Sequence, residues 1–269
     1  MDQKTLIPVS ILLAGLLVAG AVFYSNKQPS TVGQGTANVD TNGEVLIEVS
    51  PIDENDWVQG NRDAQIALIE FSDTECPFCK RLHETMNEIV TEYDDSEVAW
   101  AYRHLPLTQL HSKAGVEALA LECAGELGGN DGFWDYTNQL YAETPSNNGL
   151  DLTRLPEIAE ENGLDRTTFE SCLESDRHQE RIQEDVDDAT RSAAHLGGRV
   201  GTPYTVLVSQ TELNADALTV LGEIATQYNR PGQTIVTVSD DNMRATLSGA
   251  LPKEMWTTIL DAALGKVQS

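Results

Sequence analysis

The stretch IALIEFSDTECPFCKRLHE, residues 66–84, decides the fold that we expect for this chain of 269 residues. Its first half belongs to a nearly continuous apolar run, residues 64–71, as in a central strand that is covered on both faces. Its second half opens a pattern of apolar residues at steps of three and four, residues 79–93, which is typical of an amphipathic helix. The motif Cys-Pro-Phe-Cys therefore lies between a central strand and the helix that follows it.

The spacing of Cys76 and Cys79 predicts a chemical role for both residues. Three residues apart on the first turn of a helix, they share one face at a separation that a disulfide can bridge. At a helix N-terminus, unpaired N–H groups and the macrodipole stabilise a thiolate, so we expect Cys76 to be the nucleophile with a lowered pKa. Cys79, one turn further in, is expected to be the more buried resolving thiol. Pro77 suits the first helical position because it has no N–H group and its φ is already helical.

The remaining secondary structure follows from hydrophobic periodicity. Short strands are expected at residues 45–49, 97–103, 204–209 and 245–248, and a closing helix at residues 254–264. The chain between the second and third of these strands is almost wholly helical in pattern, which indicates a helical insertion over about residues 108–196. Its expected helices are residues 115–127, 133–141, 152–161, 167–173 and 177–196. A further insertion, about residues 212–242, holds a helix-like run and the strand-like residues 234–238.

Three motifs in the order IALIEFSDTECPFCKRLHE (66–84), YRHLPL (102–107) and GTPYTVLV (201–208) give the chain a specific resemblance. Over residues 45–265 it resembles the DsbA-like family of thiol:disulfide oxidoreductases. The resemblance implies an α/β thioredoxin-like fold with an inserted α-helical subdomain. It also implies a cis peptide bond before Pro203, facing the dithiol, and a Thr202 backbone that hydrogen-bonds an extended substrate. The insertion at residues 212–242 departs from the family pattern.

Glu70 lies six residues before Cys76 on the central strand, where relatives often have a buried acid near the resolving cysteine. A carboxyl group buried there would have a raised pKa and could relay a proton to or from Cys79. The alternative is a solvated glutamate at a sheet edge, because unpaired acids are rarely buried.

Two further cysteines lie inside the helical insertion. Cys123 falls on an apolar stripe, and Cys172 lies beside Phe169 and Leu173. In an oxidising compartment, two buried cysteines of one subdomain tend to pair, so we expect a structural disulfide between them. The alternative is a pair of inert buried thiols.

Two histidines and a group of aromatic residues have competing interpretations. His83 follows Cys79 by four residues on one helix face, but a fourth ligand at a usual spacing is missing, and we expect no metal and no cofactor. His104 is expected to be a packing or loop residue near the site. The aromatic residues could form a peptide-binding patch, but their helical spacing favours core positions: Phe133, Trp134, Tyr136 and Tyr141.

The N-terminal region predicts a membrane anchor. Residues 5–24 are uncharged and mostly apolar, and about 20 such residues span a bilayer as a helix. The small residues 19–21 would suit a cleaved signal peptide, but they lie inside the apolar run. We expect an anchor at 1–24, a polar flexible linker at 25–43 and a catalytic domain at 44–269. Lys4 and Lys27 flank the span and hardly discriminate its orientation, so the extracytoplasmic placement is inferred from the segment's position.

Composition excludes one class of partner. The chain has 17 Lys and Arg against 43 Asp and Glu, a formal net charge of −26, which repels phosphate backbones and anionic lipid surfaces. Nucleic acid is therefore not an expected partner. A hydrophobic content of 40% is ordinary for a globular protein and supports a core.

The function expected from the residues and the resemblance is disulfide exchange. The leading hypothesis is a monomeric oxidase that acts on exported proteins with free thiols and is reoxidised by a membrane quinone-linked partner of the DsbB or vitamin K epoxide reductase type. A reductase or an isomerase remains open, because both use this fold at other potentials. From another class, a thioredoxin-fold copper or zinc chaperone would use Cys76, Cys79 and a histidine. A third hypothesis is a tethered binding domain in which the dithiol only stabilises the structure. In that case, Cys76 would have an ordinary thiol pKa.

Overall fold

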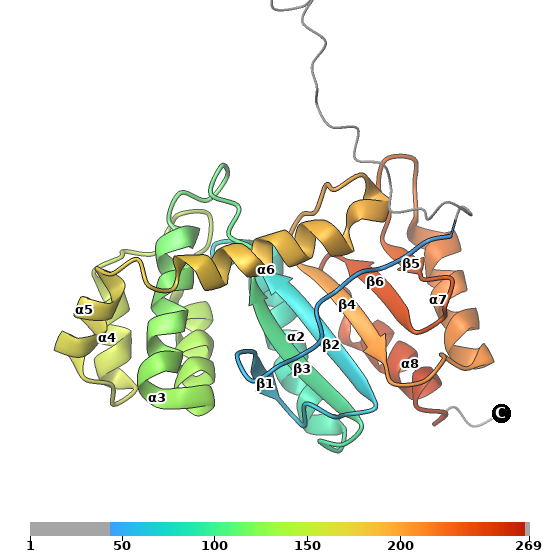
Figure 1. The fold of residues 1–269 in the computed structure, drawn as a ribbon, viewed down its shortest axis with the longest axis horizontal. Coiled ribbons are helices and arrows are strands. Elements are labelled where there is room, and N and C mark those ends of the chain that lie inside the picture. Colours follow the sequence, from blue (N-terminus) through green and yellow to red (C-terminus); the bar gives the residue numbers. More distant parts are fainter. Residues whose placement is uncertain (1–43, 267–269) are drawn as a thin grey trace, which may run out of the picture. The chain divides into compact units, whose positions relative to one another are not determined.

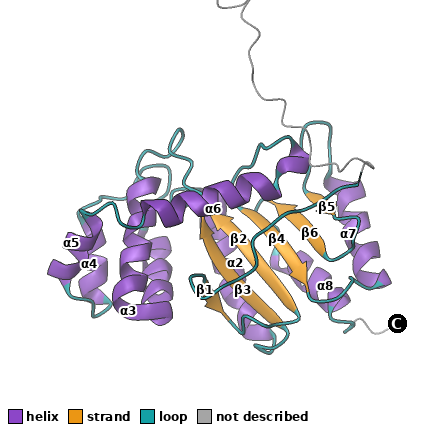
Figure 2. Cartoon of the chain, viewed as in Figure 1, coloured by secondary structure: helices purple, strands orange, loops and turns teal. Residues whose placement is uncertain are grey.

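The central feature of the computed structural model, which describes residues 44–266, is a single six-stranded sheet (Figures 1 and 2). Its strand order is β1-β3-β2-β4-β6-β5. β2 lies in the interior as expected, with β3 parallel on one side and β4 antiparallel on the other. The strands are β1 Trp57–Gln59, β2 Ile66–Ser72, β3 Val98–His104, β4 Tyr204–Ser209, β5 Val236–Val238 and β6 Arg244–Ser248.

The predicted anchor and linker, residues 1–43, lie outside the described residues. Across residues 44–266, every helix is too short or too polar to cross a membrane.

The alternation of side chains along β2 divides the core into two layers. Ile66 and Leu68 pack into the larger hydrophobic cluster together with residues of the helices, whereas Ile69 and Phe71 pack into a second cluster on the opposite face of the sheet. Successive side chains of a strand alternate between faces. Glu70 therefore lies on the face of Leu68, against which the helix that carries the dithiol packs.

Helix α2, Pro77–Glu92, begins directly after the motif's first cysteine. Cys76 is its N-cap residue and Pro77 its first helical residue, as the sequence predicts. The helix buries Cys79, Leu82 and Met86 against the sheet. Helix α8, Lys253–Ala263, packs beside it, in agreement with the expected closing helix.

The helical insertion between β3 and β4 is confirmed. It consists of α3 Ala114–Glu143, α4 Arg154–Glu161, α5 Arg166–Leu173, α6 Gln179–Ser192 and a short 3-10 turn η1 Ala194–Leu196. Helices α3, α4 and α5 form a group beside the sheet, and α6 returns across one sheet face (Figure 1). The two helices expected at residues 115–127 and 133–141 run on as one element with a kink at Gly129, whose φ is +67°.

The expected strand at residues 45–49 is wrong. This segment is irregular, although Ile47 is buried against the sheet, and the strand on the outer side of β3 is β1 instead. The backbone of Val45 pairs with Asp240, through its N–H to the Asp240 carboxylate and its carbonyl to the Asp240 N–H. Apart from a single bridge at Val45, the apolar run therefore reflects burial across a sheet face and not strand pairing.

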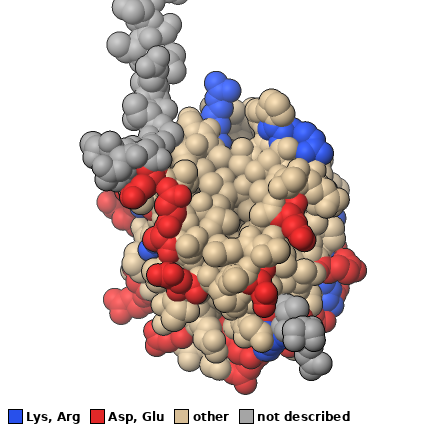
Figure 3. Space-filling view, turned by 90° about the vertical axis from the view of Figure 1, so that its right-hand side faces the viewer, with Lys and Arg blue, Asp and Glu red and all other residues tan. Residues whose placement is uncertain are grey.

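The second insertion, predicted at residues 212–242, adds a helix and an edge strand. Helix α7, Ala215–Tyr228, packs against α8 and β5, and β5 extends the sheet beyond β6. Figure 3 shows the side of the molecule on which α7 and β5 lie. Asp and Glu side chains gather along its left and lower margins, and its centre is largely uncharged.

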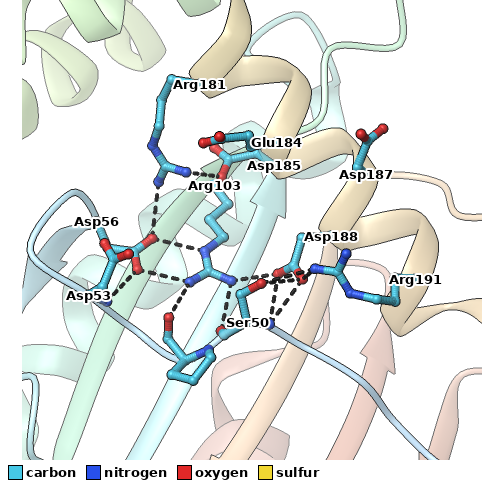
Figure 4. Close-up of a pocket in the computed structure, with 11 residues that line it drawn as sticks. Ser50, Asp53, Asp56, Arg103, Arg181, Glu184, Asp185, Asp187, Asp188 and Arg191 are labelled. Atoms are coloured by element: carbon cyan, nitrogen blue, oxygen red, sulfur yellow. Dashed lines mark hydrogen bonds and ion pairs between the residues drawn. The ribbon is translucent and has the colours of Figure 1, made fainter.

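A buried arginine joins the sheet to two peripheral segments (Figure 4). Arg103 on β3 donates hydrogen bonds to the carboxylates of Asp56 and Asp188 and to the carbonyl groups of Ser50 and Pro51. Asp188 belongs to α6, and the other three residues precede β1. One guanidinium group therefore fastens α6 and the segment before β1 to β3.

Candidate active site

The two cysteines of the motif lie together at the start of α2 with free thiols. The Cys76 side chain is 5% exposed, and Cys79 is completely buried. This is the order of accessibility that a nucleophilic thiol and a resolving thiol require.

Several hydrogen bonds stabilise the ionised form of Cys76. The thiol of Cys79 contributes most, followed by the Thr202 side chain and the backbone N–H groups of Cys79 and Phe78. These bonds outweigh the burial that opposes ionisation and lower the pKa of Cys76 to about 6. The helix N-terminus that the sequence predicts supplies two of the donors.

Cys79 has the opposite tendency. Burial, followed by the neighbouring Cys76 sulfur, raises its pKa well above the ordinary thiol value, and the Asp73 N–H donates to its sulfur at 3.4 Å. At neutral pH, the reduced pair therefore holds one proton, on Cys79, and one negative charge, on Cys76.

The loop before β4 faces Cys76. The Thr202–Pro203 peptide bond is cis, and the Cys76 sulfur lies 3.5 Å from the Thr202 carbonyl oxygen. The Thr202 hydroxyl is buried, has no geometric hydrogen-bond partner among the described residues, and is free to turn toward the Cys76 sulfur. The structure thus brings Cys76 to Thr202 and Pro203, although Cys76 lies 126 residues before Thr202.

Glu70 is completely buried and is not a solvated edge residue. Its carboxyl group accepts hydrogen bonds from the Ser72 hydroxyl at 2.7 Å and the Trp100 indole at 3.0 Å. Burial raises the pKa of Glu70 to about 7, against the effect of these two donors. A carboxyl group with this pKa can hold or release a proton near neutral pH.

A chain of buried hydroxyl groups continues from Glu70, and the sequence did not indicate it. The Ser72 hydroxyl lies 3.0 Å from the Tyr141 hydroxyl, which lies 3.2 Å from that of Tyr102. Ser72 could have been placed on the Glu70 face, because it lies two residues further along β2. Tyr141 lies on α3, and no local sequence pattern predicts that its hydroxyl contacts Ser72.

A second acid beside the motif was also missed. Glu75 directly precedes Cys76, and its carboxylate accepts the N–H groups of Asn148 and Gly149. Burial, together with the adjacent Glu75, raises the pKa of Glu117 to about 8. Glu75 thus fixes the loop after α3 next to the dithiol, and Glu117 favours its protonated form.

The two histidines are held by other side chains. His83 lies 2.8 Å from the Asn138 side-chain oxygen and stacks on Tyr141, and burial lowers its pKa to about 4. His104 is the last residue of β3 and lies 2.8 Å from a carboxylate oxygen of Glu122. His104 is therefore a packing residue of a strand and not a loop residue.

Phe78, between the two cysteines, is the large apolar side chain that the motif exposes. It is 53% exposed, and the Arg81 guanidinium lies 5.2 Å from its ring centre. The aromatic residues weighed as a peptide-binding patch are instead buried in the core, as helical spacing predicts: Phe133, Trp134, Tyr136 and Tyr141.

The other two cysteines, Cys123 on α3 and Cys172 on α5, are joined by a disulfide bond. The bond links two helices of the insertion, and both residues are buried.

A sheet with a parallel β2–β3 pair, a vicinal dithiol at the start of the intervening helix and a cis-proline loop opposite define a thioredoxin-fold protein. The sequence pattern of the family described as Thioredoxin matches residues 53–216, and the chain belongs to that family.

Solved structures share this fold. DsbA2 of Pseudomonas aeruginosa is 23% identical with a TM-score of 0.53, over 79% of this chain and 96% of that one. Wolbachia pipientis α-DsbA1 is 18% identical with a TM-score of 0.58, over 80% and 94%. Oxidised BdbD of Bacillus subtilis is 21% identical with a TM-score of 0.51, over 60% and 85%.

Curated relatives match in sequence over part of their length. The Na(+)/H(+) antiporter NhaA 3 of Salinispora tropica is 34% identical over 160 residues, which is 60% of this chain and 22% of the antiporter. The Na(+)/H(+) antiporter NhaA 1 of Mycolicibacterium gilvum is 32% identical over 142 residues, which is 52% of this chain and 22% of the antiporter. The chain thus matches about a fifth of the length of these relatives.

Proposed function

We propose that this chain is a thiol:disulfide oxidoreductase that donates its Cys76–Cys79 disulfide to thiols of exported proteins. The observation that carries the proposal is the asymmetry of the pair. Cys76, 5% exposed and facing Thr202, has a pKa lowered to about 6, whereas the pKa of the completely buried Cys79 is raised. Such a pair opens at one defined sulfur.

The reaction consists of two exchanges. A substrate thiolate attacks the Cys76 sulfur, the bond to Cys79 breaks, and Cys79 leaves with the electron pair and takes up a proton. Glu70 supplies this proton, because its pKa of about 7 lies below that of Cys79. The substrate's second thiolate then attacks the substrate's first sulfur, which is bonded to Cys76, and expels the Cys76 thiolate. The substrate loses two electrons, and the Cys76–Cys79 pair gains them.

The stability of the Cys76 thiolate supports the oxidising direction. Hydrogen bonds to that thiolate stabilise the reduced enzyme, and a more stable reduced form makes the disulfide a stronger oxidant. Phe78 and Arg81 offer an exposed apolar and cationic surface next to Cys76, suited to an unfolded peptide. A reductase or an isomerase would require a lower potential at the same dithiol.

The proposed setting is the outer side of a membrane, with residues 5–24 as anchor and a quinone-linked membrane oxidase of the DsbB or vitamin K epoxide reductase type as electron acceptor. A protein of the same fold, α-DsbA2 of Wolbachia pipientis, is a thiol-disulfide exchange protein, which supports the proposed chemistry. No ion transport is proposed, because the antiporter relatives are matched over only 22% of their length.

The test is a redox titration of the full chain with a glutathione buffer, together with thiolate absorbance against pH. The expected result is an acidic titration that disappears in Cys76→Ser, and a potential above about −200 mV. A potential of about −270 mV would identify a reductase. A thiol titrating near about 8.5, with no exchange with a model dithiol, would leave only a structural staple and overturn the proposal.

A further inference from the structure

A second set of metal-binding side chains surrounds the disulfide of the helical insertion. Cys123 and Glu126 lie on α3, Cys172 lies on α5, and His178 immediately precedes α6. A ring nitrogen of His178 and the two sulfurs lie within 4.8 Å of one another. Three ligand-type side chains therefore meet at one place.

Glu126 completes the group. One of its carboxylate oxygens lies 2.8 Å from Nε2 of His178 and 3.9 Å from the sulfur of Cys172. Tetrahedral Zn²⁺ with bonds of about 2.0–2.3 Å requires ligand atoms about 3.3–3.8 Å apart. The separation of Glu126 from Cys172 is close to that spacing, and the two sulfurs can move apart once the bond between them is open.

We propose that, when the Cys123–Cys172 disulfide is reduced, the two cysteines form with His178 and Glu126 a binding site for Zn²⁺. The disulfide and the metal ion then compete for the same two sulfurs. This site is independent of the Cys76–Cys79 dithiol and of the function proposed for it.

The charges of the group suit a divalent cation. Two thiolates, the Glu126 carboxylate and the Arg177 guanidinium that donates to it carry a net charge of −2, which Zn²⁺ neutralises. Without the metal, reduction leaves two buried thiols next to a carboxylate and an imidazole. A bound cation gives all of these groups a partner.

An open cavity of about 520 Å³ lies on the His178 and Glu126 side of the group, and both of these residues line it. Its wall carries more acids than bases, with Glu54, Glu122, Glu180 and Glu184 beside Arg177 and Arg181. Acidic walls raise the local concentration of cations. The two sulfurs are buried, so the metal reaches them from the side of His178 and Glu126.

The change from the disulfide to the metal-bound form requires a reductant. An external dithiol transfers two electrons to the disulfide, the sulfur–sulfur bond breaks, each sulfur takes a proton, and the dithiol becomes a disulfide. Zn²⁺ then binds the two thiolates and releases those two protons. A disulfide oxidant reverses the sequence by removing two electrons, re-forming the bond and expelling Zn²⁺.

The experiment uses the full chain with Cys76→Ser and Cys79→Ser, so that the motif dithiol cannot bind metal. The protein is reduced with dithiothreitol, freed of it without oxygen, checked by circular dichroism and titrated with Co²⁺. We expect one Co²⁺ per chain, with thiolate charge-transfer bands and the visible spectrum of tetrahedral Co²⁺, and displacement by Zn²⁺. The oxidised protein is expected to give neither signal.

Variants assign the ligands. Cys172→Ser is expected to abolish the charge-transfer bands, and His178→Ala and Glu126→Gln to weaken binding in the reduced chain. The matched control is Glu180→Gln, which changes a cavity carboxylate outside the ligand group and should bind as the parent does. The proposal is overturned by a reduced chain that shows only octahedral Co²⁺, by binding that survives Cys172→Ser, or by loss of the fold on reduction.

Discussion

At the level of single residues, the charge on Cys76 depends on donors from two distant parts of the chain. Cys79 and the backbone of α2 provide one set, and Thr202, in the loop before β4, provides the other. The motif alone therefore does not determine the acidity of its first thiol. Folding that brings the loop to the helix is required as well.

We expect Thr202→Val to raise the pKa of Cys76 above about 6, by up to about one unit, because valine keeps the shape but cannot donate to the thiolate. Thiolate absorbance against pH measures the shift. Thr205→Val is the matched control, since the buried Thr205 hydroxyl also lacks a partner among residues 44–266 but does not contribute to the Cys76 thiolate. An unchanged pKa in Thr202→Val would remove the loop from the account of Cys76 acidity.

Glu70 links the site to pH. Its native pKa of about 7 lies above its ordinary value of 4.5, so between these values the native state retains a proton that the unfolded chain has released. The free energy of unfolding therefore falls as the pH rises from about 4.5 to about 7, by at most about 3 kcal/mol from this group.

Glu70→Gln is expected to flatten that slope and to gain stability relative to the parent mainly above pH 7. Denaturant unfolding of the oxidised protein at several pH values measures it, with the exposed Glu84→Gln on α2 as control. A parallel pH profile for parent and Glu70→Gln would mean that the buried carboxyl is not protonated in the native state.

The sequence predicted those site residues that local spacing or a motif defines. Cys76, Cys79, Thr202 and Pro203 meet as the motifs imply, and their catalytic roles remain proposals. Tyr141 could not be placed, because its contact with Ser72 depends on how α3 packs against the sheet. A single sequence carries no local signal for such a contact.

At the level of elements, the Arg103 cluster in Figure 4 decides how α6 and the segment before β1 are held. Arg181 and Arg191 of α6 add ion pairs to Asp56 and Asp188 at its margin. Removing Arg103 would leave two buried carboxylates without their main partner, and such changes typically cost about 3–5 kcal/mol.

We therefore expect Arg103→Leu to lower the free energy of unfolding by about 3–5 kcal/mol, measured by chemical denaturation. Arg154→Leu is the control. Arg154 pairs with Glu143, Glu157 and Glu161 at the surface, where solvent screens ion pairs and each contributes little to stability. Equal losses in the two variants would contradict the special role of burial at Arg103.

Elements with strong periodicity were predicted best. The dithiol helix, the central strand and the helices of the insertion lie where the apolar pattern indicates. The strand expected at residues 45–49 failed because burial of Ile47 imitates strand composition. Likewise, Gly129 kinks α3 without ending it. From the sequence alone, a glycine that kinks a helix looks the same as one that ends it.

For the whole molecule, the formal charge of −26 is the dominant electrostatic property. Like charges repel in the compact state, and salt screens exposed charges over about 10 Å at 0.1 M and about 3 Å at 1 M. We expect NaCl to raise the melting temperature at pH 7, and to raise it less near the pI of 4.3, where many carboxylates are protonated. Thermal unfolding at both pH values measures this, and a decrease with salt at pH 7 would show that attractive ion pairs dominate.

Residues 45–56 determine where mechanical tension would enter the fold. Val45 is bound to Asp240 in the β5–β6 turn, Ser50 to Asp188 and Pro51 to Arg103. A force applied to the chain at Glu44 would break these hydrogen bonds one after another before it acted on β2. The domain could thus yield at its margin under force while the strand that leads to Cys76 stayed in register.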